Sequence, residues 1–234
     1  MGHKAGIYEK CIKRMLDFVL SLGALIVLSP VLLLLTVVGA VIMKGNPFFS
    51  QLRPGKNEVI FKLIKFRSMT CEKDKYGNLL PDEQRMTTYG KLLRLTSLDE
   101  IPELWNILKG DMSIVGPRPF LVRDCVFFTE EQHRRHSVRP GLTGLAQVNG
   151  RNNITWEQKF EYDLKYIDEG ITFVKDFKIV LKTVVKVLEH SDVARDGTES
   201  DMDFGDWLLM HNEINKDEYD CKQEQAKKIL EDAV

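Results

Sequence analysis

The sequence predicts an α+β fold that is mainly helical, in which a broken, membrane-inserted helix precedes a compact domain with short β elements. An uncharged run of about 26 residues near the N-terminus is interrupted by a proline. Most of the chain after this run repeats apolar residues at helical spacing, and one short segment alternates as a strand does. The 234 residues are enough to bury one sizeable core.

Charge and cysteine content bound the class of protein. The 33 basic and 34 acidic side chains nearly balance, so the net charge gives no reason to expect a nucleic acid partner. Four cysteines without paired spacing suit a reducing compartment. The first two thirds of the chain carry most of the arginines, and the segment after Ser191 is acidic. We therefore divide the chain into a basic segment, a membrane helix, a domain and an acidic tail with an expected helix, at residues 1–16, 17–44, 45–190 and 191–234.

The uncharged run at residues 18–43 is longer than the roughly 20 residues that a transmembrane helix needs. Ser29 and Pro30 lie near its middle. Proline removes one backbone hydrogen bond and clashes with the preceding turn, so a break is expected there. Each half is then about 18 Å long at about 1.5 Å per residue, which is less than a hydrocarbon core of roughly 30 Å. We expect the Ser29 hydroxyl to bond a backbone group freed at the break.

Both flanks of the uncharged run are basic. The flanking residues are Lys4, Lys10, Lys13 and Arg14 on one side and Lys44, Arg53, Lys56, Lys62, Lys65 and Arg67 on the other. Lysine and arginine favour the cytoplasmic side of a membrane, so both ends of the run are expected on that side. A re-entrant helix satisfies both flanks, whereas a proline-kinked spanning helix, the alternative, satisfies only one. We therefore expect a monotopic protein whose domain faces the cytoplasm.

The first half of the domain contains one expected strand and two expected helices. The segment "EVIFKLIKF" predicts a short strand, and residues 75–84 predict a surface loop. The segment "YGKLLRLTSLDEIPELWNILKG" predicts two helices around a tight junction at residues 96–99, with Gly110 ending the second. The segments "GDMSIVGPRP" and "RPGLTGLAQVNGR" hold too much glycine and proline for regular elements, so we expect fixed loops that carry arginine.

Two further helices are expected in the second half of the domain. The first has a stripe of apolar residues that should face the core, at Trp156, Phe160, Leu164 and Ile167. The second, "DFKIVLKTVVKVLE", repeats lysine at Lys178, Lys182 and Lys186. This spacing fits either a solvated face or an interfacial amphipathic helix that lies on anionic lipid.

The adjacent carboxylates Asp99 and Glu100 have two interpretations. In the first, Ser97 and Glu100 form a capping box, or Asp99 is the N-cap with Pro102 in the first turn. Either arrangement explains the pair by helix-end hydrogen bonds and the macrodipole, without catalysis. For an arbitrary sequence this first interpretation is favoured.

In the second interpretation the acidic pair belongs to a phosphate site. A helix N-terminus attracts phosphate, and the planar guanidinium of arginine suits bidentate phosphate contacts. Adjacent carboxylates hold Mg²⁺ together with substrate phosphate, and a carboxylate can also attack phosphorus to give an acyl phosphate. The candidate arginines are Arg94 upstream, Arg118 between two prolines, and Arg139 and Arg151 around the glycine-rich loop.

Four motifs in order, behind the broken apolar run, decide between these interpretations. "QLRPG", "KFRSM", "LRLTSLDEIPELWNILKGDMSIVGPRP" and "RPGLTGLAQVNGR" closely resemble the bacterial sugar transferase family, over residues 8–188. These are small monotopic polyprenyl-phosphate phosphoglycosyl transferases. The resemblance implies an enzyme of the bacterial inner membrane that moves a sugar 1-phosphate from a UDP-sugar to undecaprenyl phosphate. It also implies that UMP is released and that the product initiates glycan assembly, such as capsule or exopolysaccharide synthesis.

The resemblance also implies roles for individual residues. Asp99 matches the nucleophile that holds the phosphosugar covalently, and Glu100 matches a Mg²⁺ ligand and candidate base for the second transfer; both are expected metal ligands. Ser29 and Pro30 match the helix-breaking pair of the re-entrant helix. The basic residues that match phosphate-binding positions of the family are Lys65, Arg94, Arg118 and Arg151.

Some features depart from the family pattern. Glu58 stands where the family often has a second glycine, so the backbone there is expected to differ. The tail lies outside the common core, and its helix around residues 214–230 offers a contact for a second copy of the chain. The pair Asp201 and Asp203 looks like the DxD metal motif of glycosyltransferases, but a polar and mobile surrounding segment disfavours it.

Two alternatives to the leading hypothesis stay open. A membrane-associated glycosyltransferase would release UDP instead of UMP, and a non-catalytic membrane scaffold would use the acidic pair only as a helix cap. A zinc cluster of Cys125, His133 and His136 is disfavoured because it lacks a fourth ligand and a recognisable spacing. The motifs do not distinguish UDP-glucose, UDP-galactose and UDP-N-acetylated hexosamines as donors.

Overall fold

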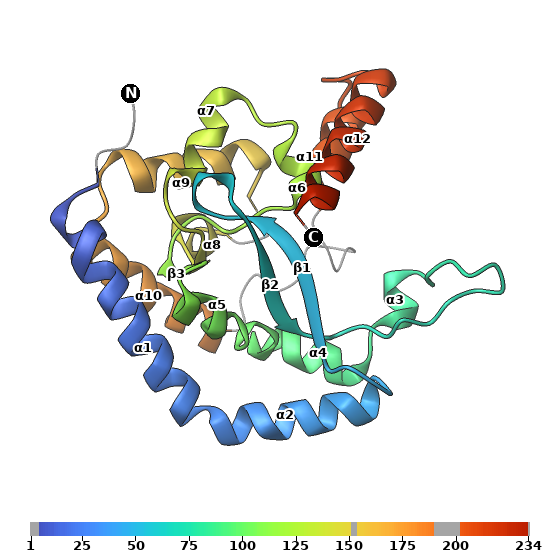
Figure 1. Ribbon diagram of the computed structural model, residues 1–234, viewed down its shortest axis with the longest axis horizontal. Helices are drawn as coiled ribbons and strands as arrows, with labels where there is room; N and C mark the ends of the chain where they lie inside the picture. The colour runs from blue at the N-terminus through green and yellow to red at the C-terminus, as the bar shows by residue number, and fades with distance from the viewer. Residues whose placement is uncertain (1–4, 151–153, 190–201, 234) are drawn as a thin grey trace.

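The computed structural model describes residues 5–150, 154–189 and 202–233. Within these ranges the protein is mainly helical with two small two-stranded sheets, as predicted. Figure 1 shows α1 and α2 as a bent arm along one side and the base of the molecule. The β1–β2 hairpin stands at the centre, and the C-terminal helix α12 lies at the far end from the arm (Figure 1).

The helices are, in chain order, η1 Tyr8–Ile12, α1 Lys13–Val27, α2 Ser29–Ile42, η2 Lys56–Glu58, α3 Asp82–Arg85, α4 Thr88–Leu95, η3 Leu98–Glu100, α5 Glu103–Lys109, α6 Val122–Cys125, α7 Glu130–His133, η4 Arg134–Ser137, α8 Leu145–Val148, α9 Trp156–Asp168, α10 Phe173–Leu188, α11 Phe204–Met210 and α12 Lys216–Asp232. The strands are β1 Phe48–Pro54, β2 Ile60–Phe66, β3 Ser113–Val115 and β4 Gly141–Thr143. Strands β1 and β2 pair antiparallel, and β3 and β4 pair parallel.

The uncharged run forms two helices joined at a sharp bend. Helices α1 and α2 break at Leu28 and, taken with η1, are bent by 63°. Pro30 has no N–H to donate to the carbonyl of Ile26, and the Ser29 hydroxyl donates to that oxygen instead at 2.7 Å. The predicted break, and the hydrogen bond expected of Ser29, are therefore confirmed. Among the described residues no single helix has the length and apolar composition of a membrane span, but this bent pair together does.

Helix α1 docks on the domain through its polar side. The carboxylate of Asp17 accepts the backbone N–H of Ile114 at 3.0 Å. The guanidinium of Arg14 donates to the carbonyls of Ile107 and Leu108, at 2.6 and 2.8 Å, and so satisfies the C-terminal end of α5. Apolar side chains of both α1 and α2 remain exposed, among them Phe18, Leu20, Ile26, Leu33, Leu34 and Val41. The buried side of the arm is thus partly polar, and its exposed side is apolar.

The two glycine-rich segments were predicted as irregular loops, and this prediction is wrong for part of each. Ser113–Val115 and Gly141–Thr143 pair as the parallel strands β3 and β4, and α8 follows directly. The strands approach so closely that a Cβ on Gly141 would lie 2.1 Å from the backbone nitrogen of Gly116. Glycine is therefore required where the two strands pair. The pairing of β3 with β4 fixes the chain on either side of these strands, including the Pro-Arg-Pro loop that follows β3.

The other local predictions are mostly confirmed. Strand β2 covers the predicted strand, and α4 and α5 are the two helices predicted around a tight junction. Gly110 ends α5 with a left-handed φ of 98°. On α9 the predicted core stripe includes the buried residues Trp156, Phe160 and Ile167. The surface loop at residues 75–84 is confirmed except that it runs into the short helix α3.

The C-terminal tail folds back on the domain instead of extending from it. Phe204 is buried in an aromatic cluster with Phe128, Trp156 and Phe160, and its N–H donates to Asp124 at 2.8 Å. The apolar side of α12 packs on α6 and β2 through Ala226, Ile229 and Leu230. The face that was predicted to contact a second copy is therefore used, at least in part, within the chain.

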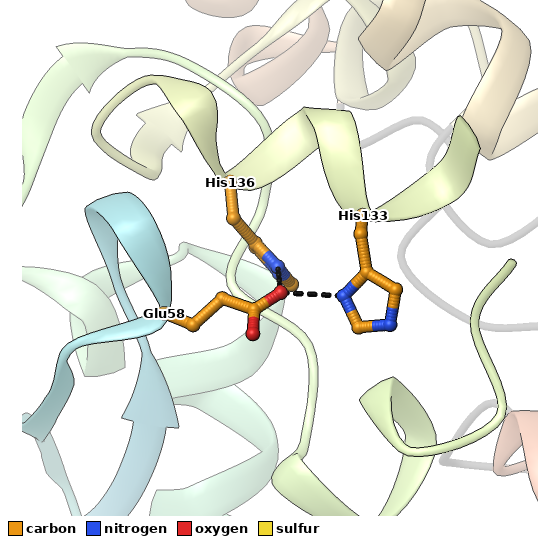
Figure 2. A group of neighbouring side chains, drawn as sticks. All are labelled: Glu58, His133 and His136. Carbon is orange, nitrogen blue, oxygen red and sulfur yellow. Dashed lines mark hydrogen bonds and ion pairs between the residues drawn. The ribbon is translucent and has the colours of Figure 1, made fainter. Parts of the chain in front are cut away.

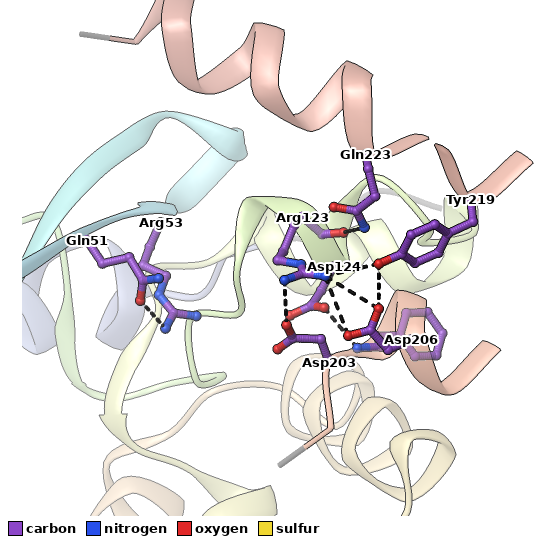
Figure 3. Close-up of polar contacts among 9 residues, drawn as sticks. Gln51, Arg53, Arg123, Asp124, Asp203, Asp206, Tyr219 and Gln223 are labelled. Carbon is purple, nitrogen blue, oxygen red and sulfur yellow. Dashed lines mark hydrogen bonds and ion pairs between the residues drawn. The ribbon is translucent and has the colours of Figure 1, made fainter. Parts of the chain in front are cut away.

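A polar network also ties the tail to α6 (Figure 3). Arg123 pairs with Asp203 at 3.0 Å and with Asp206 at 3.4 Å. The Tyr219 hydroxyl of α12 accepts from Arg123 at 3.1 Å and donates to Asp206 at 2.5 Å. Asp203 lies just before α11 and is paired with Arg123, which argues against its use in a DxD metal motif. The other residue of that motif, Asp201, lies outside the described residues.

Phe204→Ala is expected to weaken tail docking by about 3 kcal/mol or more, because it removes a buried ring from the aromatic cluster. Hydrogen exchange of the α12 amides measures this change. The matched control is Met210→Ala on the same helix, whose side chain is 59 % exposed. Equal protection of α12 in the wild type and in the Phe204 variant would contradict this account of the tail.

Candidate active site

The acidic pair lies in a tight turn between two helices. Helix α4 ends at Leu95, and Ser97 has a left-handed φ of 55° that redirects the chain. Asp99 and Glu100 then occupy one turn of 3-10 helix, η3, and α5 begins at Glu103. No side chain caps η3 or α5. The helix-capping interpretation of the acidic pair is therefore wrong.

Glu100 is at the centre of a charge cluster. Its Oε1 accepts from Lys65 Nζ at 2.8 Å and from Arg118 Nη2 at 2.6 Å. Lys65 also pairs with the buried carboxylate of Glu103 at 3.0 Å. Lys65 comes from β2, Arg118 from the loop after β3, and both glutamates from the η3–α5 turn. The structure therefore brings Lys65 and Arg118 to the acidic pair, as the sequence predicted.

The carboxyl groups of this cluster have different pKa values. Burial alone would raise the pKa of Glu100, but Arg118 and Lys65 hold it well below its usual range. Burial and the neighbouring Glu100 raise the pKa of Asp99 to about 6. Burial is also the main cause that raises the pKa of Glu103, to about 7. Lys65 and Arg118 thus stabilise the charged form of Glu100 most strongly, and they only partly offset the burial of the Asp99 and Glu103 carboxylates.

A buried scaffold holds the Arg118 loop. Arg135 donates to the backbone carbonyl of Arg118 at 2.6 Å and pairs with Asp163 at 2.6 Å. Its guanidinium lies 3.9 Å from the centre of the Phe120 ring, an arrangement that adds a cation–π attraction. Arg53 donates to the carbonyl of Pro119 at 3.2 Å from the β1 side. The backbone carbonyls of Arg118 and of the following Pro119 are therefore each held by an arginine.

The remaining predicted site residues lie as follows. Arg94 lies in the last turn of α4 and donates to Ser68 Oγ at 3.2 Å. It also lies close enough to Asp99 to oppose the rise in the pKa of that carboxyl. Arg151 lies outside the described residues. Ser29 and Pro30 belong to the bend between α1 and α2, and have no part in the charge cluster.

Sequence reasoning missed three residues of this region. Glu103 and Arg135 are buried, Arg53 is half-buried, and all three contact the cluster or its loop. Glu103 follows Glu100 by one helical turn, and this i, i+3 spacing was the available signal for it. The motif "QLRPG" contains Arg53, although no role was given to it. No local pattern marks Arg135, because its partners Arg118 and Asp163 are distant in the chain.

The structure also contains an apolar pocket whose lining includes Pro102 of the η3–α5 turn. Its volume is about 340 Å³, and it lies between the bent helix pair and the β2 and α5 elements. One lining residue, Ile64, directly precedes Lys65 in the sequence. Another, Pro102, follows Glu100 by two residues. The other lining residues are Leu25, Leu32, Thr36, Phe48 and Trp105.

The residues present suit a divalent cation with oxygen ligands. Asp99 and Glu100 offer carboxylate oxygens, which Mg²⁺ prefers. Burial and the neighbouring Glu100 raise the pKa of Asp99 despite Lys65, Arg118 and Arg94, and a divalent cation at this carboxylate would favour its charged form. Asp99 and Glu100 would hold the ion, and it would supply charge neutralisation on substrate phosphates. This cofactor is a proposal for the chain.

An acidic pair set among lysine and arginine side chains has the composition of a phosphoryl-transfer site. Comparison with known proteins agrees with that class. The model of the bacterial sugar transferase family matches residues 8–190. The chain therefore belongs to the bacterial sugar transferase family, and it is an enzyme, a phosphoglycosyl transferase.

Individual relatives extend the comparison. The sugar transferase EpsL of Bacillus subtilis is 50 % identical over 178 residues, which cover 76 % of this chain and 87 % of EpsL. The UDP-glucose:undecaprenyl-phosphate glucose-1-phosphate transferase of Klebsiella pneumoniae is 41 % identical over 189 residues, covering 74 % of this chain and 39 % of the relative. The galactosyl transferase CpsE of Streptococcus agalactiae is 39 % identical over 191 residues, covering 75 % and 42 %. The matches span less than half the length of the last two relatives.

Proposed function

We propose that this enzyme transfers a sugar 1-phosphate from a UDP-sugar to undecaprenyl phosphate, through a covalent phosphosugar on Asp99, with release of UMP. The observation that carries the proposal is the position of Asp99. It lies next to a carboxylate paired with Lys65 and Arg118, and it precedes by three residues Pro102, which lines an apolar pocket on the bent helix pair. The names of the relatives support the same reaction class.

In the first transfer the Asp99 carboxylate attacks the β-phosphorus of the UDP-sugar. A new bond forms between its oxygen and phosphorus, and the bond to the bridging oxygen of UMP breaks, so that UMP leaves with the electron pair. Arg118 and Lys65 lie where they stabilise the charge that develops on the phosphoryl oxygens. Because Glu100 stays ionised, it keeps both cations in place while the phosphate groups change.

In the second transfer an oxygen of undecaprenyl phosphate attacks the same phosphorus. The bond to Asp99 breaks, and Asp99 regains its carboxylate. The strongly lowered pKa of Glu100 makes it a weak base, so the lipid phosphate reacts as its dianion while Glu100 keeps Lys65 and Arg118 in place. Two displacements at one phosphorus let the soluble donor leave before the lipid acceptor reacts.

The lipid acceptor requires an apolar surface for its isoprenoid chain, and the 340 Å³ pocket on the bent helix pair offers one. We propose that the first isoprenoid units occupy this pocket, with the lipid phosphate at Lys65 and Arg118. The bent pair α1–α2 then acts as a re-entrant anchor in the cytoplasmic leaflet of the inner membrane. Exposed apolar residues on α10, among them Phe173, Phe177, Leu181 and Val184, make this helix suited to lie on the same surface.

Trp105→Ala tests the lipid pocket. The indole lines the pocket and is 51 % exposed, so its loss removes apolar contact area with little effect on the core. We expect the KM for undecaprenyl phosphate to rise about 3- to 10-fold, with the KM for the UDP-sugar unchanged. Initial rates against each substrate measure the two values, and Leu92→Ala, an exposed apolar residue outside the pocket, is the control. A similar rise in both KM values would contradict the assignment of the pocket.

The function itself is tested by the nucleotide product and by the covalent adduct. Purified enzyme is incubated with undecaprenyl phosphate and a panel of UDP-sugars, and UMP and UDP are separated by chromatography. Intact-protein mass spectrometry after rapid quenching with donor alone should find the mass of one phosphosugar, located on Asp99 by peptide mapping. Release of UDP without an adduct would instead support a glycosyltransferase.

A further inference from the structure

A second cluster of metal-ligating side chains lies apart from the acidic pair. Figure 2 shows Glu58 from the tip of the β1–β2 hairpin between His133 of α7 and His136 of η4. We propose that these three residues bind a divalent transition-metal ion of the Zn²⁺ class. The site goes beyond the proposed function, since nothing in the transfer reaction uses these residues.

The three ligand atoms converge on one point. Oε1 of Glu58 lies 2.5 Å from Nδ1 of His133 and 3.0 Å from Nδ1 of His136, and all three ligand atoms lie within 4.8 Å of one another. Ligands of a tetrahedral zinc ion with bonds of about 2.1 Å lie about 3.4 Å apart. Small side-chain rotations therefore suffice to admit the ion. Two imidazole nitrogens with one carboxylate form a ligand set that Zn²⁺ accepts and that Mg²⁺ and Ca²⁺ do not prefer.

The surroundings of His136 fix its ring in the orientation that binding needs. The ring is buried and stacks on Phe128, with ring centres 5.9 Å apart. Its second nitrogen, Nε2, lies 3.9 Å from Sγ of Cys125. The sequence-based cluster of Cys125, His133 and His136 is thus corrected, because Cys125 lies at the wrong nitrogen and Glu58 takes the place of the third ligand.

The hairpin tip presents Glu58 at a conformational cost. Glu58 has a φ of 63° and Asn57 a φ of 53°, values that side chains other than glycine, asparagine and aspartate rarely adopt. A carboxylate at this position therefore needs a compensating interaction, and contact with both histidines supplies one. The side chains of Glu58 and His133 are 50 % and 37 % exposed, so one side of the site is open for water as a further ligand.

The site would act as a clamp between two distant parts of the chain. It joins the β1–β2 hairpin to the α7–η4 segment, and Arg135 between the two histidines donates to the backbone of Arg118. An ion at this point would stabilise the segment that holds the phosphate-binding loop. The expected role is structural, because Glu58, His133 and His136 make none of the contacts of the acidic pair.

The test is metal binding by the full chain in detergent micelles after chelator treatment. Isothermal titration with Zn²⁺ should give one strong equivalent per chain in the wild type, and Co²⁺ should give the intense visible bands of a four- or five-coordinate ion. Glu58→Gln separates a metal site from a hydrogen-bonded cluster, since glutamine still accepts from both histidines but binds metal poorly. We expect Glu58→Gln and His133→Gln to weaken Zn²⁺ binding by about 10- to 100-fold or more.

Two controls make the result decisive. His211→Gln, whose histidine bonds only to Trp207 among its described contacts, should bind as the wild type does. Asp99→Asn should also retain the strong equivalent, which shows that the acidic pair is not the site measured. Zn²⁺ should raise the melting temperature of the wild type by several degrees but not that of Glu58→Gln. The proposal is overturned if Glu58→Gln binds Zn²⁺ as tightly as the wild type, or if no strong equivalent is found.

Discussion

Asp99→Asn is expected to reduce turnover by about 10³-fold or more, because the amide cannot form the acyl phosphate on which both transfers depend. The change is nearly isosteric, and no helix cap is lost, since no side chain caps η3 or α5. The free energy of unfolding should therefore change little, because the half-buried Asp99 carboxylate is only partly neutralised by its neighbours and its charge contributes little to stability. UMP release and thermal unfolding measure the two expectations side by side.

The matched control for this variant is Asp82→Asn, which removes a carboxylate from the exposed start of α3. It should retain wild-type turnover. A folded, inactive Asp99→Asn enzyme beside an active control supports catalysis by Asp99. Normal turnover by Asp99→Asn would remove the basis for the covalent route and would support a purely structural role for the acidic pair.

The elements that were predicted from sequence are those specified by nearby residues. The broken helix depends on Pro30 and its neighbours, and the end of α5 depends on Gly110, which adopts the left-handed conformation that glycine favours. Strand β2 and the core stripe of α9 follow from their own periodicity. In each of these cases the physical cause lies within a few residues of its effect.

The predictions that failed depend on contacts between distant segments. Glycine and proline were taken to exclude regular structure at β3 and β4, but the glycines allow two strands to approach more closely than any side chain permits. The capping box at Ser97, which spacing alone favoured and the motifs outweighed, does not form, because Ser97 has a left-handed backbone. Tail packing was missed because the partners of Phe204 lie in α6 and α9.

In the candidate site, too, the residues within local motifs were predicted, and those that depend on distant segments or on burial were missed. Motifs were sufficient to select Asp99, Glu100, Lys65 and Arg118, and the structure places the last three in direct ion pairs. The third carboxylate, Glu103, was missed since it reads as part of an amphipathic helix. The histidine cluster was found only in part, because Glu58 lies on a hairpin 75 residues from His133.

Arg118→Ala is expected to lower turnover by about 10²- to 10³-fold, because it removes a fixed cation from the phosphoryl group. The same change deprives Glu100 of its shortest ion pair, at 2.6 Å. Glu100→Gln should also lower turnover, since the amide holds Lys65 and Arg118 less strongly. As the two residues act through one contact, the double variant should lose much less than the product of the two single losses.

A double-mutant cycle on UMP release measures this coupling. Arg123→Ala is a suitable control, as its arginine belongs to the tail network of Figure 3 and not to the charge cluster. It should destabilise the tail while turnover at 25 °C remains near that of the wild type. If the losses from Arg118→Ala and Glu100→Gln multiply instead, the two side chains act independently. Their ion pair would then not be what positions Arg118, and the contacts of Arg135 and Arg53 with the loop backbone would set its position instead.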